Sequence, residues 1–380
     1  MSRWREYADP QPADSAGDRR DEGRALRRAV PFDAALDFEL GPPSSADDLA
    51  TAIAALPRTG IVVACVGDAP MGVVRDPEMA GRPLDVLDVD NALPGPWEYD
   101  VIGLALRLAQ GTKPRRRREI ARGVGEAYRD AVRSLARRPL YARRPEGLRR
   151  ALGLGDRRDP GVSCTRAVDL LIRDGRIRRG RVAARWASDA NGTTVIRVAP
   201  EDPEREMSLY RESLSEPEAM LLSSYRVADA FADEHGRAMV LLGRGGSTRD
   251  QLLLEAVPAG PSTLEPAFGV WRLGSDVHRV LAMRSSVPLV PPQLSGWSTS
   301  VDGALGRVWQ RARAGASGDA VRQAAAGRPG HVGEASRRGA LLGVVHACTG
   351  DAALLAGYLG NSSRFPEALA DAVELVHRGS

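Results

Sequence analysis

Lysine is almost absent from this sequence: Lys113 is the only one, so arginine makes up the rest of the 53 Lys and Arg residues. A phosphate-binding loop of the GxxxxGK[ST] type is therefore excluded, because Lys113 is followed by Pro114. Schiff-base chemistry or an SxxK nucleophile would have to use Lys113, which lies in an unfavourable basic run. The HExxH, GxSxG and complete GxGxxG patterns are absent as well. These gaps exclude the usual signatures of zinc proteases, α/β-hydrolases and dinucleotide-binding enzymes.

Cysteine and long apolar runs are also scarce. Cys65, Cys164 and Cys348 are too few and too far apart for a disulfide framework or a CxxC zinc site. No apolar run reaches the roughly 18 residues of a membrane span, and residues 1–30 lack the apolar core of a signal peptide. We therefore expect a cytoplasmic protein that does not contact membranes. Its 380 residues, 43% hydrophobic and 27% charged, predict an ordinary globular chain of two or three structural units.

Hydropathy patterns predict both helices and strands. A continuous apolar run at 61–68 and an alternating segment at 84–90 indicate strands, and Asp88 and Asp90 would share one face of the second. Hairpins are predicted at 180–198 and 225–257. Helices are predicted at 46–56, 115–138, 265–284, 334–349 and 365–377. The Pro- and Gly-containing stretch 139–163 indicates a boundary. Together these elements predict an α+β fold.

Three motifs could carry chemistry: GDAPMGVVR at 67–75, DVLDVDNALPGPWEYD at 85–100, and VHACTGD at 345–351 with AGYLG at 356–360. They resemble the GDxHxxNFG, DxNDFDExxxGPWxWD and AHARSGD…GYLG motifs of the DUF2252 family. Residues 226–246 and 252–266 resemble that family's glycine-containing hairpin and its KEAxxSxLEP strand. The resemblance covers about residues 30–377.

The DUF2252 family is related to aminoglycoside phosphotransferases and protein kinases. The resemblance therefore implies a kinase-like fold with a smaller β-rich lobe and a larger helical lobe. Because the catalytic-loop and metal-loop motifs precede the glycine hairpin, we infer a circular permutation. The expected domains are a mobile tail at 1–30, a helical lobe with both motifs at 31–160, a β-rich segment at 161–290, and a helical segment at 291–380 that packs on the helical lobe.

The resemblance gives roles to three carboxylates. Asp68 matches the catalytic-loop aspartate, which accepts the proton of the attacking hydroxyl. Asp88 matches the metal-binding aspartate, and Asp90 is the second acidic residue of that block. Asp88 and Asp90 would thus hold Mg²⁺ if an ion is bound, or act as an acid–base pair. The alternatives from the residues alone are that Asp68 caps a turn and that Asp88 and Asp90 form a solvated strand edge.

The sequence departs from the family pattern where phosphotransfer needs it most. Pro70 replaces the motif's histidine, Val73 its Mg²⁺-binding asparagine, and Leu254 the lysine of KEA. The glycine hairpin reads ADAFADEHGR at 228–237, and its acidic side chains would repel a triphosphate. Losing one charge-stabilising group costs about 10²–10³ in rate. We therefore expect no ordinary ATP-dependent phosphotransfer and no cofactor; the alternative is ATP with Mg²⁺.

Four further side chains are candidates for lining a cleft: Trp97, Trp271, Trp297 and His346. The alternative is packing, above all for His346, which lies in the apolar stretch LLGVVHAC. A cleft with fewer charges and more apolar lining would suit an apolar small molecule.

The basic segment 113–150 holds fourteen Lys or Arg residues but only Tyr128 and Tyr141 as aromatics. Such a segment is typical of a solvated helix face, so we do not expect nucleic-acid binding.

The sequence leaves three functions open. The first is a degenerate kinase-like protein that binds or transforms a small molecule, in a setting such as bacterial specialised metabolism. The second is an atypical phosphotransferase with Asp68 as base, in which Arg237, Arg272 or Arg279 replaces the lysine. The third is a pseudokinase that binds a protein partner without catalysis.

Overall fold

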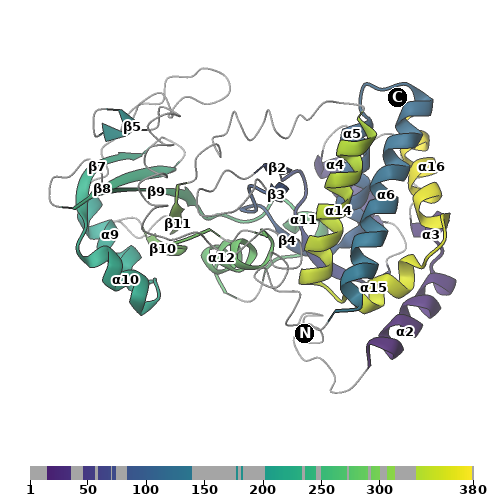
Figure 1. Ribbon diagram of the computed structural model, residues 1–380, viewed down its shortest axis with the longest axis horizontal. Coiled ribbons are helices and arrows are strands. Elements are labelled where there is room, and N and C mark those ends of the chain that lie inside the picture. The colour runs from purple at the N-terminus through teal and green to yellow at the C-terminus, as the bar shows by residue number, and fades with distance from the viewer. Residues whose placement is uncertain are drawn as a thin grey trace. The chain divides into compact units, whose positions relative to one another are not determined.

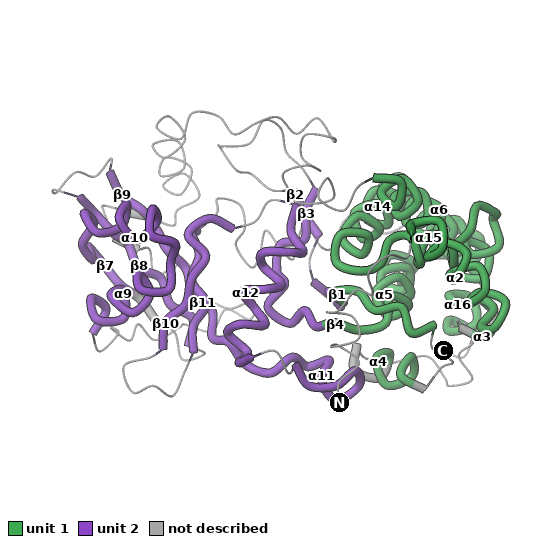
Figure 2. Tube along the Cα trace, turned by 90° about the horizontal axis from the view of Figure 1, so that it is seen from below, with its two compact units in different colours: residues 1–65, 94–143, 329–380 green, residues 66–93, 144–328 purple. Residues whose placement is uncertain are grey.

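The computed structural model describes residues 15–35, 46–55, 59–69, 71–73, 84–138, 177–178, 181–182, 202–232, 236–244, 250–271, 274–289, 292–299, 306–312 and 331–378. Helices and small antiparallel sheets alternate along the chain, so the α+β class is confirmed (Figure 1). The chain divides into two compact units (Figure 2). Unit 1 contains residues 1–65, 94–143 and 329–380, and unit 2 contains residues 66–93 and 144–328.

Unit 1 is helical. Its elements are α2 (Ala16–Ala29), α3 (Phe32–Ala35), α4 (Ala46–Ala55), α5 (Trp97–Ala109), α6 (Pro114–Ala136), α14 (Val332–Thr349), α15 (Ala352–Leu359), α16 (Arg364–Arg378) and strand β1 (Val62–Cys65), which pairs with β4 (Leu93–Pro96). Helix α6 is the centre, and α5, α14, α15 and α16 all contact it. A Cβ atom on Gly339 of α14 would lie 2.5 Å from the Val124 carbonyl oxygen of α6. Glycine at this position lets the two helix backbones approach closely.

Helix α6 confirms the predicted amphipathic stripe. Its apolar side chains Ile120, Val124 and Tyr128 are fully buried. Its arginines pair with acids of α16 in the same unit, through Arg117–Glu374 at 3.0 Å and Arg122–Glu367 at 2.8 Å. Part of the basic segment is therefore neutralised within unit 1.

The mobile tail expected at residues 1–30 is corrected over 16–29, where the structure has helix α2. Ser15 caps this helix, and its side chain accepts a hydrogen bond from the Asp18 amide. A Cβ on Gly23 would lie 2.1 Å from the Leu354 carbonyl oxygen of α15, so only glycine fits there. Arg19 also forms a 2.6 Å ion pair with Asp351. The sequence of α2 lacks apolar periodicity, and backbone packing and ion pairs hold this helix instead.

Unit 2 contains a five-stranded antiparallel sheet in the order β10-β11-β9-β8-β7. The strands are β7 (Arg226–Ala232), β8 (Ala238–Gly243), β9 (Gln251–Pro258), β10 (Gly296–Thr299) and β11 (Gly306–Arg311). The predicted hairpin at 225–257 is confirmed, with Val240 of β8 opposite Leu254 of β9. One face of the sheet packs on Met207 and Tyr210 of α9 (Pro203–Glu212).

Smaller elements complete unit 2. They are the strands β2 (Met71–Val73), β3 (Leu84–Val86), β5 (Ile177–Arg178) and β6 (Arg181–Val182), and the helices α10 (Glu216–Ser223), α11 (Glu265–Phe268) and α12 (Asp276–Ser286). Most of the hairpin predicted at 180–198 lies outside the described residues. None of the described helices is long and apolar enough to cross a membrane.

The two units do not follow the expected domain boundaries. Residues 66–93, with most of the two acidic motifs, belong to unit 2 and not to the helical unit. The chain passes from unit 1 to unit 2 between residues 143 and 144, inside the stretch 139–163 that the sequence marks as a boundary. The N-terminal, central and C-terminal segments of unit 1 come together because α5, α14, α15 and α16 pack on α6, and α2 packs on α15.

Candidate acidic site in unit 2

The hairpin formed by β2 and β3 brings two of the predicted carboxylates to the same end. The strands are antiparallel, and Met71 lies opposite Val86. Asp68 precedes β2 and Asp88 follows β3, so both residues lie beyond the Met71–Val86 pair. The pairing thus gathers residues that are distant in the sequence.

Asp68 lies in the turn after β1. Gly67 has a φ of 59°, a left-handed conformation that glycine adopts easily, and the Ala69 amide donates to the Val66 carbonyl oxygen at 3.0 Å. The Asp68 side chain is exposed. It forms no ion pair with any residue that the structure describes. Its carboxylate is thus accessible to a ligand.

Asp88 is exposed at the surface, and its Oδ1 accepts a hydrogen bond from the Asp90 amide at 3.1 Å. Its pKa is raised above the ordinary value, first because the surrounding protein desolvates the carboxylate and then because Asp90 carries a negative charge. Arg284 and Arg237 act in the opposite direction. Asp88 therefore holds a proton to higher pH than an isolated aspartate.

Asp90 is engaged by an arginine. The Arg284 Nε donates to Asp90 Oδ1 at 2.8 Å, and Nη2 donates to Oδ2 at 3.0 Å. The Arg284 side chain is only 5% exposed and that of Asp90 26%. Asp90 is therefore neutralised from inside unit 2, unlike Asp88.

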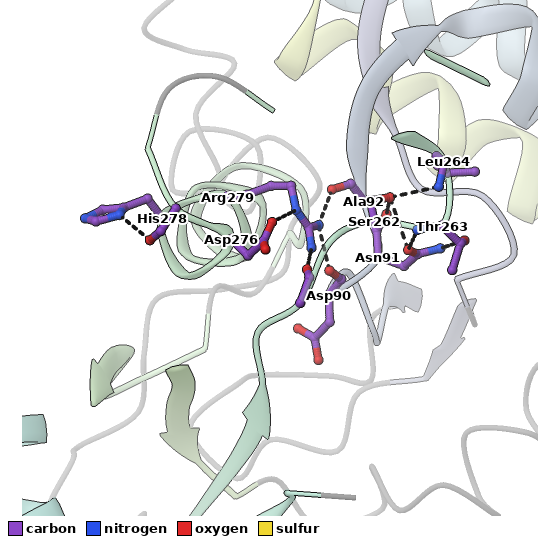
Figure 3. A network of polar contacts seen from close by, with 11 residues as sticks. Asp90, Asn91, Ala92, Ser262, Thr263, Leu264, Asp276, His278 and Arg279 are labelled. Atoms are coloured by element: carbon purple, nitrogen blue, oxygen red, sulfur yellow. Dashed lines mark hydrogen bonds and ion pairs between the residues drawn. The ribbon is translucent and has the colours of Figure 1, made fainter. Parts of the chain in front are cut away.

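The backbone around Asp90 is fixed by a second arginine of α12. Arg279 is buried, and its guanidinium donates to the carbonyl oxygens of Asp90 at 2.7 Å, Ala92 at 2.8 Å and Gly260 at 2.6 Å (Figure 3). Its pKa is lowered because burial disfavours the charged form. Arg279 therefore stabilises the turn that contains Asp88, Asp90 and Asn91, which we call the acidic turn. It is not free to replace a phosphate-binding lysine.

Asn91 ties the same turn to the segment before α11. Its Oδ1 accepts a hydrogen bond from the Thr263 amide at 2.8 Å, and its Nδ2 donates to the Thr263 Oγ1 at 2.8 Å (Figure 3). The Ser262 hydroxyl donates to the Asn91 carbonyl oxygen at 2.7 Å. Together with Arg279, these contacts make the acidic turn a rigid part of unit 2.

The residues at this turn do not fit a Mg²⁺ site. Mg²⁺ prefers octahedral oxygen ligands, and both Asp90 oxygens already bind Arg284. The part of the chain that the structure describes contains no group of three or more residues suited to hold a metal. Val73, at the position of the asparagine ligand, has no side-chain oxygen. The expected metal role of Asp88 and Asp90 thus lacks a complete set of ligands.

The position of the missing lysine is part of the hydrophobic core. Leu254 is fully buried in a cluster with Val240, Met207 and Trp309. Of the other arginines considered as substitutes, Arg237 is exposed and Arg272 lies outside the described residues. The acidic residues 233 and 234 of the glycine hairpin lie outside them as well.

Two of the expected cleft residues lie in the core of unit 1, which corrects that expectation. Trp97 is fully buried, stacks on Tyr128 with ring centroids 5.9 Å apart, and donates to the Thr59 hydroxyl at 3.1 Å. His346 is also fully buried, with Nε2 3.0 Å from Asp100 Oδ2 and Nδ1 2.8 Å from the Tyr128 hydroxyl. Trp97 is the first residue of α5 and His346 lies within α14, and both helices pack on α6.

The other two candidates lie in unit 2. Trp297 is half-buried in β10, and its ring centroid lies 6.2 Å from that of His278. Trp271 is half-buried as well. Sequence reasoning missed Arg284 as the partner of Asp90 and missed the Tyr128–His346–Asp100 network, because no local pattern marks contacts between residues so distant in the chain.

Of the comparisons with known proteins, only the one with protein families gives a match. Neither a curated protein nor a solved structure matches this chain. The family model described as "Uncharacterized protein conserved in bacteria (DUF2252)" matches residues 45–378, which is most of the chain and includes all the motifs above. The chain therefore belongs to the DUF2252 family.

Proposed function

We propose that this protein is a degenerate, kinase-like member of the family that has lost ATP-dependent phosphotransfer and binds a small molecule at the acidic end of the β2–β3 hairpin. One observation carries the proposal. Asp90, which the family resemblance assigns to the metal site, is paired with Arg284, and Leu254, at the position of the family's lysine, is packed in the core. Asp68 and Asp88 remain exposed.

The loss of phosphotransfer follows from charge. Phosphoryl transfer depends on cations that neutralise the oxygens of the transferred group. Leu254 supplies no such charge, and the Arg279 guanidinium already donates its hydrogen bonds to backbone carbonyl oxygens. Each missing donor costs about 10²–10³ in rate, so two or more leave no useful turnover.

The chemistry of the ligand follows from the groups that stay accessible. Carboxylates accept hydrogen bonds and attract cations, so Asp68 and Asp88 favour a ligand with amine or hydroxyl groups over a phosphate. The raised pKa of Asp88 would also let it donate a proton while Asp68 accepts one. With Asp88 as acid and Asp68 as base, the site would transform a bound ligand and not only hold it.

The first test is calorimetric titration of the full chain with ATP and Mg²⁺, together with an assay of ADP release. We expect no binding and no release. Magnesium-dependent release that disappears in Asp68→Asn would instead establish the atypical phosphotransferase.

The second test screens amines and polyols by thermal shift. We expect stabilising compounds to lose their effect in Asp68→Asn and Asp88→Asn but to keep it in Glu216→Gln, a control at an exposed position of α10. If no compound depends on the two aspartates, the small-molecule site is refuted, and a non-catalytic protein-binding role becomes the better account.

A further inference from the structure

Asp90 occupies the position of a second acidic metal ligand, yet a single side chain of the protein takes both its oxygens. Arg284 binds them in a bidentate arrangement at 2.8 and 3.0 Å. Bidentate pairs of this kind are among the stronger hydrogen-bonded ion pairs. With Arg284 almost completely buried, water competes weakly for the guanidinium.

Helix α12 holds this guanidinium in place. The Arg284 Nη1 lies 3.4 Å from the Val308 carbonyl oxygen of β11. Arg279 of the same helix binds the carbonyl oxygens of Asp90 and Ala92. The helix thus fixes both the carboxylate and the backbone of the acidic turn, and Arg284 cannot leave Asp90 without breaking two partly buried hydrogen bonds.

A divalent cation would have to compete with this arrangement. To use Asp90 it would need to displace a fixed guanidinium, since Mg²⁺ requires oxygen ligands at about 2.1 Å. On Asp88 alone it would have one carboxylate, close enough to Arg284 for that arginine to influence the Asp88 pKa. Like charges at this range repel strongly when partly shielded from water.

We propose that Arg284 is a built-in counter-ion that takes the place of a divalent cation at the acidic turn, so that the site works without Mg²⁺ or Mn²⁺. This inference deepens the proposed function and rests on it for the role of the site, because it states how the acidic turn is neutralised while a ligand binds. Its test requires no knowledge of that ligand.

The test is a titration of the full chain with Mn²⁺ followed by electron paramagnetic resonance. The proteins compared are the wild type, Arg284→Met, Asp88→Asn, the double variant Arg284→Met/Asp88→Asn, and the control Arg311→Met on β11. Methionine keeps an unbranched side chain in the buried position and removes the charge. We expect no wild-type binding tighter than a Kd of about 1 mM, and binding at least about tenfold tighter in Arg284→Met. This gain should be absent from the double variant and from Arg311→Met.

Two results would overturn the inference. One is Mn²⁺ binding by the wild type that is lost in Asp88→Asn, and the other is an Arg284→Met protein that folds but gains no binding. Circular dichroism checks folding first, and Arg284→Gln is a second variant that keeps hydrogen-bond donors. If neither variant folds, the wild-type titration decides alone. ATP turnover without any divalent ion would refute the proposed function but not the counter-ion.

Discussion

Replacing Leu254 by lysine restores the residue that the family pattern has at this position, and we expect it to destabilise unit 2 at neutral pH. Leu254 is fully buried among Val240, Met207, Tyr210 and Trp309. A lysine in such surroundings loses its charge, with a pKa that falls to about 5–6. Keeping a group of pKa about 10.4 neutral at pH 7 costs about 4–5 kcal/mol, at 1.36 kcal/mol for each pKa unit.

The pH dependence gives the sign of this effect. A lysine whose pKa is lower in the folded protein binds fewer protons there than in the unfolded chain, so the free energy of unfolding rises with pH up to about 10.4. The penalty should fall to about 1 kcal/mol at pH 9.5, a recovery of about 3 kcal/mol. Leu254→Met is the matched control, with a cost below about 1.5 kcal/mol that does not depend on pH.

Urea denaturation followed by tryptophan fluorescence measures these differences, because Trp309 lies in the same cluster as Leu254. A Leu254→Lys protein as stable as Leu254→Met at pH 7 would refute the reasoning. It would mean that a side chain at this position reaches solvent, where a phosphate-binding lysine could still act. The argument that Leu254 removes phosphate binding would then fail.

Three other perturbations test separate features. Tyr128→Phe leaves the buried His346 Nδ1 without its 2.8 Å partner and should cost about 1–3 kcal/mol in thermal unfolding; an unchanged melting temperature would contradict the network. Asp88→Asn should raise the melting temperature at pH 7 but not near pH 3. An acid whose pKa is raised by folding destabilises the folded protein once it is ionised, and asparagine removes that charge. Equal effects at both pH values would argue against the raised pKa. The Cys65 thiol, whose pKa burial raises well above its usual value, should react with a thiol reagent only after unfolding, and the half-buried Cys348 should react sooner; prompt modification of Cys65 in the folded protein would be inconsistent with its burial.

Local patterns determined much of the fold. The helical stripe of residues 115–138, the apolar run at 61–68 and the hairpin around 225–257 are all present as α6, β1 and the β7–β8–β9 strands. Periodicity is enough in these cases because each element buries one continuous face, and the spacing of apolar residues encodes that face directly. The sequence motifs likewise led to the family that the comparison found.

Contacts between distant segments decided the rest. Helix α2 has a polar sequence, and it is held by glycine contacts and an ion pair with α15 rather than by an apolar stripe. Tryptophan and histidine are residue types that line clefts, but helix packing buries Trp97 and His346 in the core of unit 1.

The acidic turn shows the same division. The motif placed Asp68, Asp88 and Asp90 together in function, and the β2–β3 register brings Asp68 and Asp88 to one end of a hairpin. Only the tertiary structure separates Asp88 from Asp90, because Arg284 reaches Asp90 across 194 positions of the chain. A sequence specifies which charges exist, but the burial and pairing that set their chemistry arise only when distant segments pack against one another.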